Sequence, residues 1–162
     1  MTLDWESLYD EHAGELVGYV AKLVGDREVG SDLMQETFIL GIRGAGSIRD
    51  AAAVRAWLFR TATNLAYSHR RRQAILAFLP FTGREQTARG TFDIEADQVR
   101  TALRAIPADQ AAALLLFYDN GFARAEVSDL LGVSEETVKS RLARGRRNFI
   151  AAYRRLERGL AR

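Results

Sequence analysis

Apolar residues recur every three or four positions along most of the chain, the spacing that places them on one face of an amphipathic helix. The clearest stripe lies in the helix expected over Leu8–Val24 and consists of Leu8, His12, Leu16, Val20 and Leu23. No segment shows the alternation of apolar and polar residues that is typical of a half-buried strand. The pattern therefore predicts an all-α protein.

The helical pattern breaks between two blocks, the first ending near Arg72 and the second beginning near Ile94. The intervening segment L-P-F-T-G-R-E-Q-T-A-R-G-T-F-D contains a proline, two glycines and several polar residues, a composition typical of a linker. We therefore predict two small helical domains, residues 1–74 and 94–162, joined by a flexible linker over residues 75–93.

The start of this linker is more apolar than a freely solvated tether should be. Its apolar residues are Ile75, Leu76, Phe78, Leu79 and Phe81. Exposed apolar clusters of this kind usually pack against something. The sequence leaves open whether the cover comes from the protein's own domains or from a groove on a partner.

The helix expected over Val29–Arg43 has two apolar faces. One face consists of Val29, Leu33, Thr37 and Leu40, and the other of Met34, Phe38 and Ile42. Asp32, Gln35 and Glu36 lie between them. Two apolar faces indicate two packing partners, namely the domain core and either a neighbouring helix or another protein.

The segment G-V-S-E-E-T-V-K-S-R-L-A-R-G-R-R, residues 132–147, has the capping, periodicity and charge of a DNA-binding helix. Gly132 ends the preceding helix R-A-E-V-S-D-L-L, and Ser134 is placed to cap the next one. Val138, Leu142 and Phe149 share the packing face of that helix, and polar and basic residues lie opposite. The pattern predicts a C-terminal helix-turn-helix domain. A solvated basic helix is the alternative interpretation.

The helix expected over Ala51–Arg72 carries a second row of polar residues. Arg60, Asn64, Tyr67 and Arg71 follow at spacings of four, three and four and therefore lie on one face. Arginine binds phosphate and tyrosine can stack on an exposed base, so the row suits single-stranded or melted nucleic acid. The alternative is an ordinary solvated charged face.

Charge is distributed unevenly along the chain, whose net charge is only +2. Residues 122–162 carry ten Lys or Arg against five Asp or Glu, a net charge of +5, whereas residues 1–75 carry nine against ten. Affinity for DNA without sequence preference grows with the number of phosphates neutralised. The small total charge therefore predicts that tight DNA binding requires a partner.

Composition argues against several other functions. The 162 residues include no cysteine, which excludes disulfides and thiolate metal sites, and the two histidines are isolated. We expect neither a metal nor another cofactor. The N-terminus lacks a basic-then-apolar signal, and the longest apolar run, Ala111–Tyr118, is too short to span a bilayer. We therefore expect a cytoplasmic protein without membrane insertion.

Three motifs in a fixed order resemble those of one protein family. The family's polymerase-binding helix is similar to the segment S-D-L-M-Q-E-T-F. Its promoter-melting helix is similar to R-A-W-L-F-R-T-A-T-N-L-A-Y-S-H-R-R-R. Its helix-turn-helix domain is similar to A-L-R-A-I-P followed by T-V-K-S-R-L-A-R. The family is the extracytoplasmic-function (ECF) group of bacterial RNA polymerase sigma factors, and the resemblance covers nearly the whole chain.

The resemblance implies three binding surfaces. Core RNA polymerase would be contacted by Asp32, Leu33, Gln35, Glu36 and Phe38. The opening minus-ten element of promoter DNA would be contacted by Gly46, Ser47, Arg49, Arg60, Asn64, Tyr67, Arg70 and Arg71. The minus-thirty-five element would be contacted in the major groove by Glu136, Thr137, Lys139, Ser140, Arg141 and Arg144. An anti-sigma factor that covers such surfaces is a further partner that the resemblance implies.

The sequence departs from the family pattern at several positions. Ser68 replaces a common aspartate, Glu136 a glycine, Gly41-Ile42 a frequent alanine-tryptophan pair and Thr63 a frequent arginine. Glu136 could accept a hydrogen bond from a cytosine amine or repel phosphate, so the preferred minus-thirty-five sequence cannot be transferred from relatives. The loss of arginine at Thr63 is expected to weaken phosphate contact.

Two other classes of protein fit parts of the pattern. A stand-alone helix-turn-helix regulator would bind an operator unaided, usually as a dimer, but it leaves the Arg60-to-Arg71 row without a role. A helical nuclease would need clustered acidic metal ligands, for which Asp32 and Glu36 are the nearest pair. We expect no catalytic role, because no nucleophile, base and metal constellation is evident.

Overall fold

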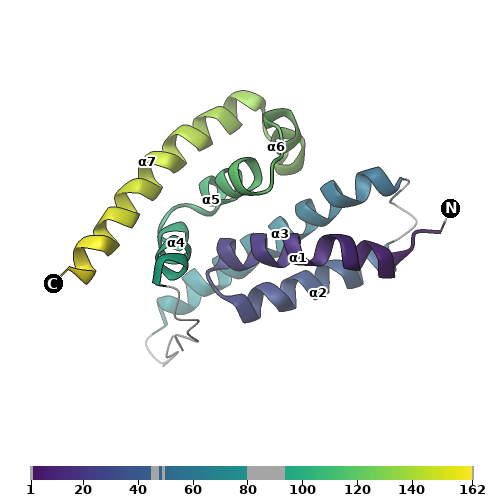
Figure 1. Cartoon of the computed structure of the whole chain (residues 1–162), viewed down its shortest axis with the longest axis horizontal. Coiled ribbons are helices and arrows are strands. Elements are labelled where there is room, and N and C mark those ends of the chain that lie inside the picture. The colour runs from purple at the N-terminus through teal and green to yellow at the C-terminus, as the bar shows by residue number, and fades with distance from the viewer. Residues whose placement is uncertain (1, 45–47, 49, 80–93, 162) are drawn as a thin grey trace.

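The computed structural model describes residues 2–44, 48, 50–79 and 94–161, and the described residues are mainly helical with no strand among them (Figure 1). The helices are α1 (Trp5–Val24), α2 (Arg27–Arg43), α3 (Ala51–Ala77), α4 (Ile94–Ala105), α5 (Ala108–Leu114), α6 (Arg124–Leu131) and α7 (Glu135–Leu160), with a π-helical turn, η2 (Leu115–Asp119), after α5. The all-α prediction is confirmed.

Aspartates fix the starts of the first helices. The side chains of Asp4, Asp26 and Asp50 accept hydrogen bonds from backbone N–H groups of the first turns of α1, α2 and α3. These caps lengthen α1 and α2 beyond the ranges expected from apolar periodicity alone, which began at Leu8 and Val29. At its other end α3 continues to Ala77, into the segment expected to be linker.

Helices α1, α2 and α3 form the N-terminal domain. Gly41 of α2 allows one close approach in it, because a Cβ atom at this position would lie 2.4 Å from the Trp5 ring and 3.2 Å from that of Trp57. The departure from alanine at position 41 therefore has a packing reason, since the two indole rings occupy the space that a side chain would need.

Helices α4 to α7 form the C-terminal domain, and α6 and α7 form the expected helix-turn-helix. Gly132 ends α6 in the left-handed conformation with φ 66°, which glycine adopts at little cost. Ser134 Oγ then accepts a 3.1 Å hydrogen bond from the Thr137 N–H at the start of α7. Val138 and Leu142 are buried, as their shared face predicts. Both the turn and the cap are confirmed.

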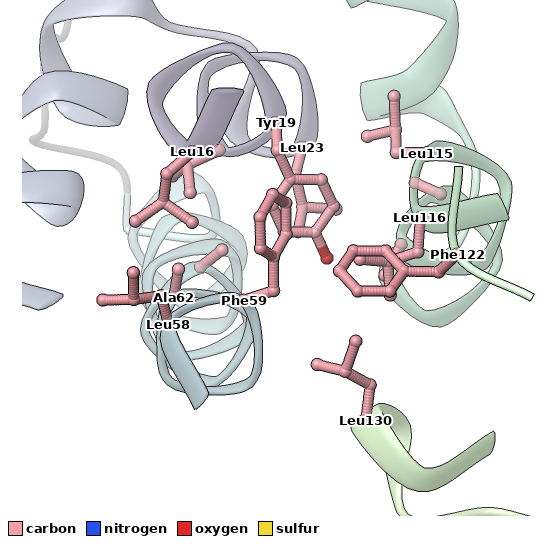
Figure 2. Close-up of a cluster of buried hydrophobic side chains, with 14 of the residues drawn as sticks. Leu16, Tyr19, Leu23, Leu58, Phe59, Ala62, Leu115, Leu116, Phe122 and Leu130 are labelled. Carbon is pink, nitrogen blue, oxygen red and sulfur yellow. The ribbon is translucent and has the colours of Figure 1, made fainter. Parts of the chain in front are cut away.

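The two domains pack directly on one another, with α1 and α3 of the first against α4, η2 and α6 of the second. Tyr19, Phe59 and Phe122 form the centre of the contact, with ring centroids 5.2 Å apart for the first pair and 5.1 Å for the second (Figure 2). Leu115, Leu116 and Leu130 surround them from the C-terminal side. The hydrophobic core is therefore continuous across both domains.

Candidate nucleic-acid interface

The first half of α7 presents the six residues expected at the minus-thirty-five element. Their backbone lies on a helix anchored by Val138 and Leu142, so they project from the other sides of it. Glu136, Lys139 and Arg144 are exposed, and Thr137, Ser140 and Arg141 are half-buried. The structure thus brings all six together at one end of α7.

Contacts with α5 and η2 hold α7 in place. Gly145 allows close approach, because a Cβ atom there would lie 3.2 Å from the Leu114 side chain. The Asn148 amide donates to Gln110 Oε1 at 2.8 Å, and Arg146 Nη1 donates to the Tyr118 hydroxyl at 3.0 Å. Arg141 Nε lies 3.5 Å from Asp109 Oδ2, so one of the six residues is already engaged within the domain. A helix fixed in this way can present its exposed face with defined geometry.

Arg70 is next to the row on α3 and belongs to the same expected minus-ten surface, so we count it with the row from here on. This row has a different environment from the face on α7. Arg60, Asn64 and Arg71 are exposed, but Tyr67 and Arg70 are half-buried against the C-terminal domain. Arg70 Nη2 donates to the carbonyl oxygens of Arg104 at 3.0 Å and Ile106 at 2.7 Å. Arg60 Nη2 also reaches the second domain, 3.3 Å from the Asp129 carbonyl oxygen. The C-terminal domain thus contacts several members of the row.

Burial shifts the pKa values of the two half-buried members. It raises the pKa of Tyr67 to about 12, with the Arg141 charge acting in the opposite direction. It also lowers the pKa of Arg70, and the neighbouring Arg104 charge lowers it further. An ordinary tyrosine is already neutral at physiological pH, and the raised pKa keeps Tyr67 in this form, in which its ring is available for stacking.

Thr63 does not lie on the row of α3 that is expected to bind DNA. Its side chain is 2% exposed, and its hydroxyl donates to the Phe59 carbonyl at 2.6 Å and bonds to the Tyr19 hydroxyl at 2.7 Å. The expectation that threonine at this position weakens a phosphate contact is wrong, because the side chain points into the core between α1 and α3.

The face of α2 expected to bind polymerase consists of two kinds of residue. Asp32, Gln35 and Glu36 are exposed, whereas Leu33 and Phe38 are only 6% and 4% exposed. Phe38 packs on the rings of Trp5 and Tyr9 within its own domain. Leu33 and Phe38 therefore support the α2 face from beneath instead of lying on its surface.

Exposed apolar side chains border this polar face of α2. They are Tyr9, Ile39, Leu40 and Ile42. Of the two apolar faces expected on α2, the residues Leu33, Met34, Thr37 and Phe38 form one broad buried face, and Leu40 and Ile42 remain exposed. Exposed apolar side chains that cluster beside polar ones are a feature of protein-binding surfaces.

Part of the predicted minus-ten surface lies outside the described residues, namely Gly46, Ser47 and Arg49, as does Phe81 of the linker. In the described part of the linker, Ile75, Phe78 and Leu79 are exposed, Phe78 to 87%. Among the described residues, Ile75 and Phe78 are thus largely exposed, which favours the partner alternative for these two side chains.

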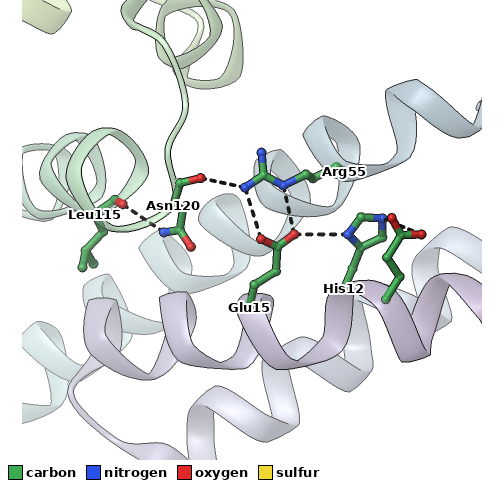
Figure 3. A network of polar contacts seen from close by, with 6 residues as sticks. His12, Glu15, Arg55, Leu115 and Asn120 are labelled. Carbon is green, nitrogen blue, oxygen red and sulfur yellow. Dashed lines mark hydrogen bonds and ion pairs between the residues drawn. The ribbon is translucent and has the colours of Figure 1, made fainter.

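A network between the domains was not evident in the sequence. Arg55 of α3 binds both carboxylate oxygens of Glu15 on α1, at 2.9 and 3.1 Å, and donates to the Asn120 carbonyl oxygen at 2.7 Å (Figure 3). Lys22 Nζ lies 2.7 Å from Asp119 Oδ2. Each residue looks like an ordinary surface charge in the sequence, and only the packing of the domains brings them together.

Within the described part of the chain, no group of three or more His, Cys, Asp or Glu residues could hold a metal ion. None of the helices there is long and apolar enough to cross a membrane. The structure does gather basic residues on two helical surfaces, the row with Tyr67 on α3 and the face of α7 in the helix-turn-helix. These features define a helical DNA-binding protein.

Sequence comparison places the chain within this class. Residues 8–75 match the family Sigma-70 region 2, and residues 96–149 match Sigma-70, region 4. The ECF RNA polymerase sigma factors SigL and SigM of Mycobacterium tuberculosis are each 33% identical to this chain over 143 residues. The match with SigL covers 84% of this chain and 81% of SigL, and the match with SigM covers 88% of this chain and 73% of SigM. The chain belongs to the ECF sigma factors of the sigma-70 family, and it directs promoter-specific transcription.

The fold is similar to a chain in the co-crystal structure of the sigma factor RpoE with the anti-sigma factor NepR from Bartonella quintana. The TM-score is 0.73 with 22% sequence identity, and the match covers 93% of this chain and 97% of that chain. At this identity the likeness concerns the fold alone.

Proposed function

We propose that this sigma factor docks on core RNA polymerase through α2, recognises the minus-thirty-five element with α7 and opens the minus-ten element with α3. The polymerase face comprises Asp32, Gln35 and Glu36, supported from beneath by Leu33 and Phe38. Polymerisation belongs to the partner enzyme, so this chain has no catalytic step of its own, and it acts in the cytoplasm with its partner and promoter.

The observation that carries the proposal is the separation of the surfaces onto different helices. The exposed acidic and amide groups of α2, the row on α3 and the exposed end of α7 belong to three elements with different chemistry. A protein that only bound an operator would need the α7 surface alone. The presence of all three supports a factor that joins an enzyme to two stretches of DNA.

Roles follow from the chemistry of each DNA surface. On α7, Lys139, Arg141 and Arg144 supply donors for guanine edges or phosphates, and Glu136 supplies an acceptor for a cytosine amine. On α3, Arg60, Arg70 and Arg71 hold phosphates, Asn64 hydrogen-bonds a base, and Tyr67 stacks on one that has left the duplex. Gly46, Ser47 and Arg49 remain part of this proposed surface.

Docking explains how a chain with a net charge of +2 achieves specific binding. Each DNA surface alone neutralises few phosphates and binds weakly. Held together on polymerase at promoter spacing, the two surfaces bind as one ligand with a high effective concentration. We also propose that an anti-sigma factor restrains the chain by covering these surfaces. The sigma factor RpoE, whose fold is similar, was crystallised in complex with the anti-sigma factor NepR.

The proposal is tested by mixing the purified chain with bacterial core RNA polymerase and a supercoiled promoter library. Co-elution with polymerase and initiation at a shared sequence motif are expected, and the motif defines the promoter. Tight binding of the chain alone to duplex operators, without polymerase binding, would replace the proposal with the regulator alternative.

A further inference from the structure

Arg141 lies on one flank of α7, between the exposed face of this helix and the face that packs in the domain. The buried Val138 and Leu142 are its neighbours on the packing side, and the exposed Arg144 lies on the other side. Of the six residues proposed to contact the minus-thirty-five element, only Arg141 forms an ion pair within the described part of the chain. The protein itself therefore influences the direction of this side chain before DNA is bound.

The carboxylate that pairs with Arg141 is fixed at the start of α5. Asp109 Oδ1 accepts a 2.9 Å hydrogen bond from the Gln110 N–H, and Oδ2 lies 3.5 Å from Arg141 Nε. Gln110 Oε1 in turn accepts the 2.8 Å hydrogen bond from the Asn148 amide, two helical turns along α7 from Arg141. Between these two points, a Cβ atom at Gly145 would lie 3.3 Å from Gln110 Cβ. The start of α5 is therefore held closely against this side of α7, which gives Asp109 little freedom to move relative to Arg141.

The guanidinium of Arg141 keeps donors for another ligand. Its Nε faces Asp109, and its two Nη groups donate no hydrogen bond to the residues that the structure describes. Neither Nη group is among the buried polar atoms that lack a partner, so both are accessible to solvent. Two Nη groups side by side form a pair of parallel donors, which matches O6 and N7 of a guanine in the major groove.

The Asp109 carboxylate also disfavours a phosphate as the ligand of Arg141. A phosphate oxygen that approached the guanidinium would approach the negative charge of Asp109 as well and be repelled, whereas the edge of a guanine is uncharged. Base edges and phosphates are the two ligands proposed for the basic residues of α7, and Asp109 favours the base edge for Arg141. Arg144 forms no ion pair with the described residues, so no neighbouring carboxylate selects between the two ligands for it.

We infer that Asp109 is a positioning residue for Arg141, which recognises a guanine of the minus-thirty-five element through its two Nη groups. The inference rests on the proposed function of α7. Asp109 contacts no base itself. It restricts the rotamers of Arg141, and this lowers the side-chain entropy that is lost when the guanidinium binds. Asp109 thereby increases the discrimination between base pairs and not the total affinity for DNA.

Base-pair discrimination by the complex with polymerase tests the inference. The probes are a labelled random duplex and labelled duplexes that carry the minus-thirty-five motif recovered in the transcription experiment, with each base pair replaced in turn. Arg141→Ala identifies the base pair that Arg141 recognises, because discrimination should be lost at that position. We expect this position to be a G·C pair.

Asp109→Asn removes the charge but keeps an oxygen that can accept the hydrogen bond from the Gln110 N–H. We expect discrimination at the G·C position to fall about twofold to fivefold, the range for an ion pair whose Arg141 and Asp109 side chains are 23% and 45% exposed. Discrimination at the other positions should not change. Affinity for the random duplex should rise slightly, because one negative charge near the DNA is removed.

Asp97→Asn is the matched control, because Asp97 is also an exposed aspartate that pairs with an arginine, Arg100, but on α4, which has no proposed DNA contact. It should leave discrimination unchanged at every position. Asp109→Glu keeps the carboxylate and should retain most of the discrimination. In an Arg141→Ala background, Asp109→Asn should have no further effect on discrimination, because the side chain that it positions is absent.

Arg141→Lys provides a second test that leaves Asp109 and the start of α5 untouched. Lysine keeps the positive charge that pairs with Asp109 but lacks the two parallel Nη donors. We expect discrimination at the G·C position to be lost as in Arg141→Ala, while affinity for the random duplex stays at the wild-type level. Circular dichroism checks that each variant is folded.

The outcomes separate the inference from the proposed function. If Asp109→Asn leaves discrimination unchanged, weakens binding to every duplex equally, or acts in the absence of Arg141, Asp109 does not position Arg141 and the inference is refuted. It is also refuted if Arg141→Ala alters no position, or one that is not a G·C pair. In each of these cases the proposed function stands as long as the wild-type complex initiates at its motif. If the wild type fails to bind polymerase, the proposed function is refuted, and the inference with it.

Discussion

The hydroxyl groups of Tyr19 and Thr63 lie 2.7 Å apart in the fully buried seam between α1 and α3. Thr63 also donates to the Phe59 carbonyl oxygen, so it accepts the proton of Tyr19. This pair connects two helices through a core that is mainly apolar. It also shows why position 63 of this chain cannot serve as a DNA contact.

Thr63→Val should destabilise the fold by about 1–3 kcal/mol, because it leaves the Tyr19 hydroxyl buried without a partner. Tyr19→Phe with Thr63→Val removes both hydroxyls and should cost less than the sum of the two single changes. Urea unfolding of the four proteins measures the coupling. Strict additivity would contradict the hydrogen bond.

Asp32→Arg should abolish co-elution with core polymerase while leaving the fold intact, because it reverses an exposed charge on the proposed docking face. Glu157→Arg makes the same change at an exposed position near the end of α7 and serves as the control. Circular dichroism checks folding, and size-exclusion chromatography checks the complex. Unchanged polymerase affinity in folded Asp32→Arg would refute the assignment of α2.

Arg144→Ala should weaken promoter binding by the polymerase complex by about 1–3 kcal/mol if the side chain contacts a base edge. Arg154→Ala, an exposed change in the second half of the same helix, should have little effect. Competition between promoter and random duplex DNA measures specificity. An equal loss for both DNAs would identify Arg144 as a phosphate contact instead.

Glu15 should give the fold a pH-dependent stabilisation. Burial raises the pKa of its carboxyl, but hydrogen bonds and charges from Arg55 and His12 outweigh burial and leave the pKa below its usual value of 4.5. A carboxyl with a lower pKa in the folded state stabilises it above the unfolded-state pKa and loses this effect as pH falls through the folded-state pKa. The stabilisation should therefore be complete above pH 4.5 and disappear at lower pH.

Urea unfolding of wild type and Glu15→Gln from neutral to acidic pH tests this dependence. The difference in unfolding free energy should be constant near neutrality and shrink once pH drops below the usual glutamate value. A difference that stays the same throughout the acidic range would show that the carboxylate charge is not what Arg55 recognises.

Local features of the fold were predictable from the sequence, and contacts between distant segments were not. The helix-turn-helix follows from Gly132 and Ser134, because the left-handed turn and the N-cap depend only on neighbouring residues. Periodicity also identified the buried faces of α1 and α7. The link between Arg55 and Asn120 joins segments far apart in the chain, and no spacing rule indicates it.

The DNA-binding roles of the α3 row and the α7 face, which residue chemistry and order suggested, stay predictions. The sequence did not indicate that Tyr67 and Arg70 would be covered by the second domain. Leu33 and Phe38 belong to the family motif, yet α2 packs against both α1 and α3, and this double contact buries them. A motif records which residues occur together, whereas exposure depends on how the helices pack.

Gly41 offers a test of that packing. The effect of Gly41→Ala on the free energy of unfolding should change sign when Trp5 is removed. In a helix, alanine is more stable than glycine by about 1 kcal/mol. At position 41, however, a Cβ atom would lie 2.4 Å from the Trp5 ring, and overpacking of a core typically costs about 1–3 kcal/mol. We therefore expect Gly41→Ala to destabilise the wild-type protein.

In a Trp5→Ala background the same Gly41→Ala change should instead stabilise the fold, because the indole that opposes the methyl group is gone. Gly18→Ala on α1 is the matched control, since nothing lies within 4 Å of a Cβ atom there, and it should stabilise both backgrounds. Thermal and urea unfolding of these variants show whether each substitution raises or lowers the free energy of unfolding. If Gly41→Ala destabilised both backgrounds equally, Trp5 would not be what requires glycine at this position, and the reason for the departure from alanine would have to lie with Trp57.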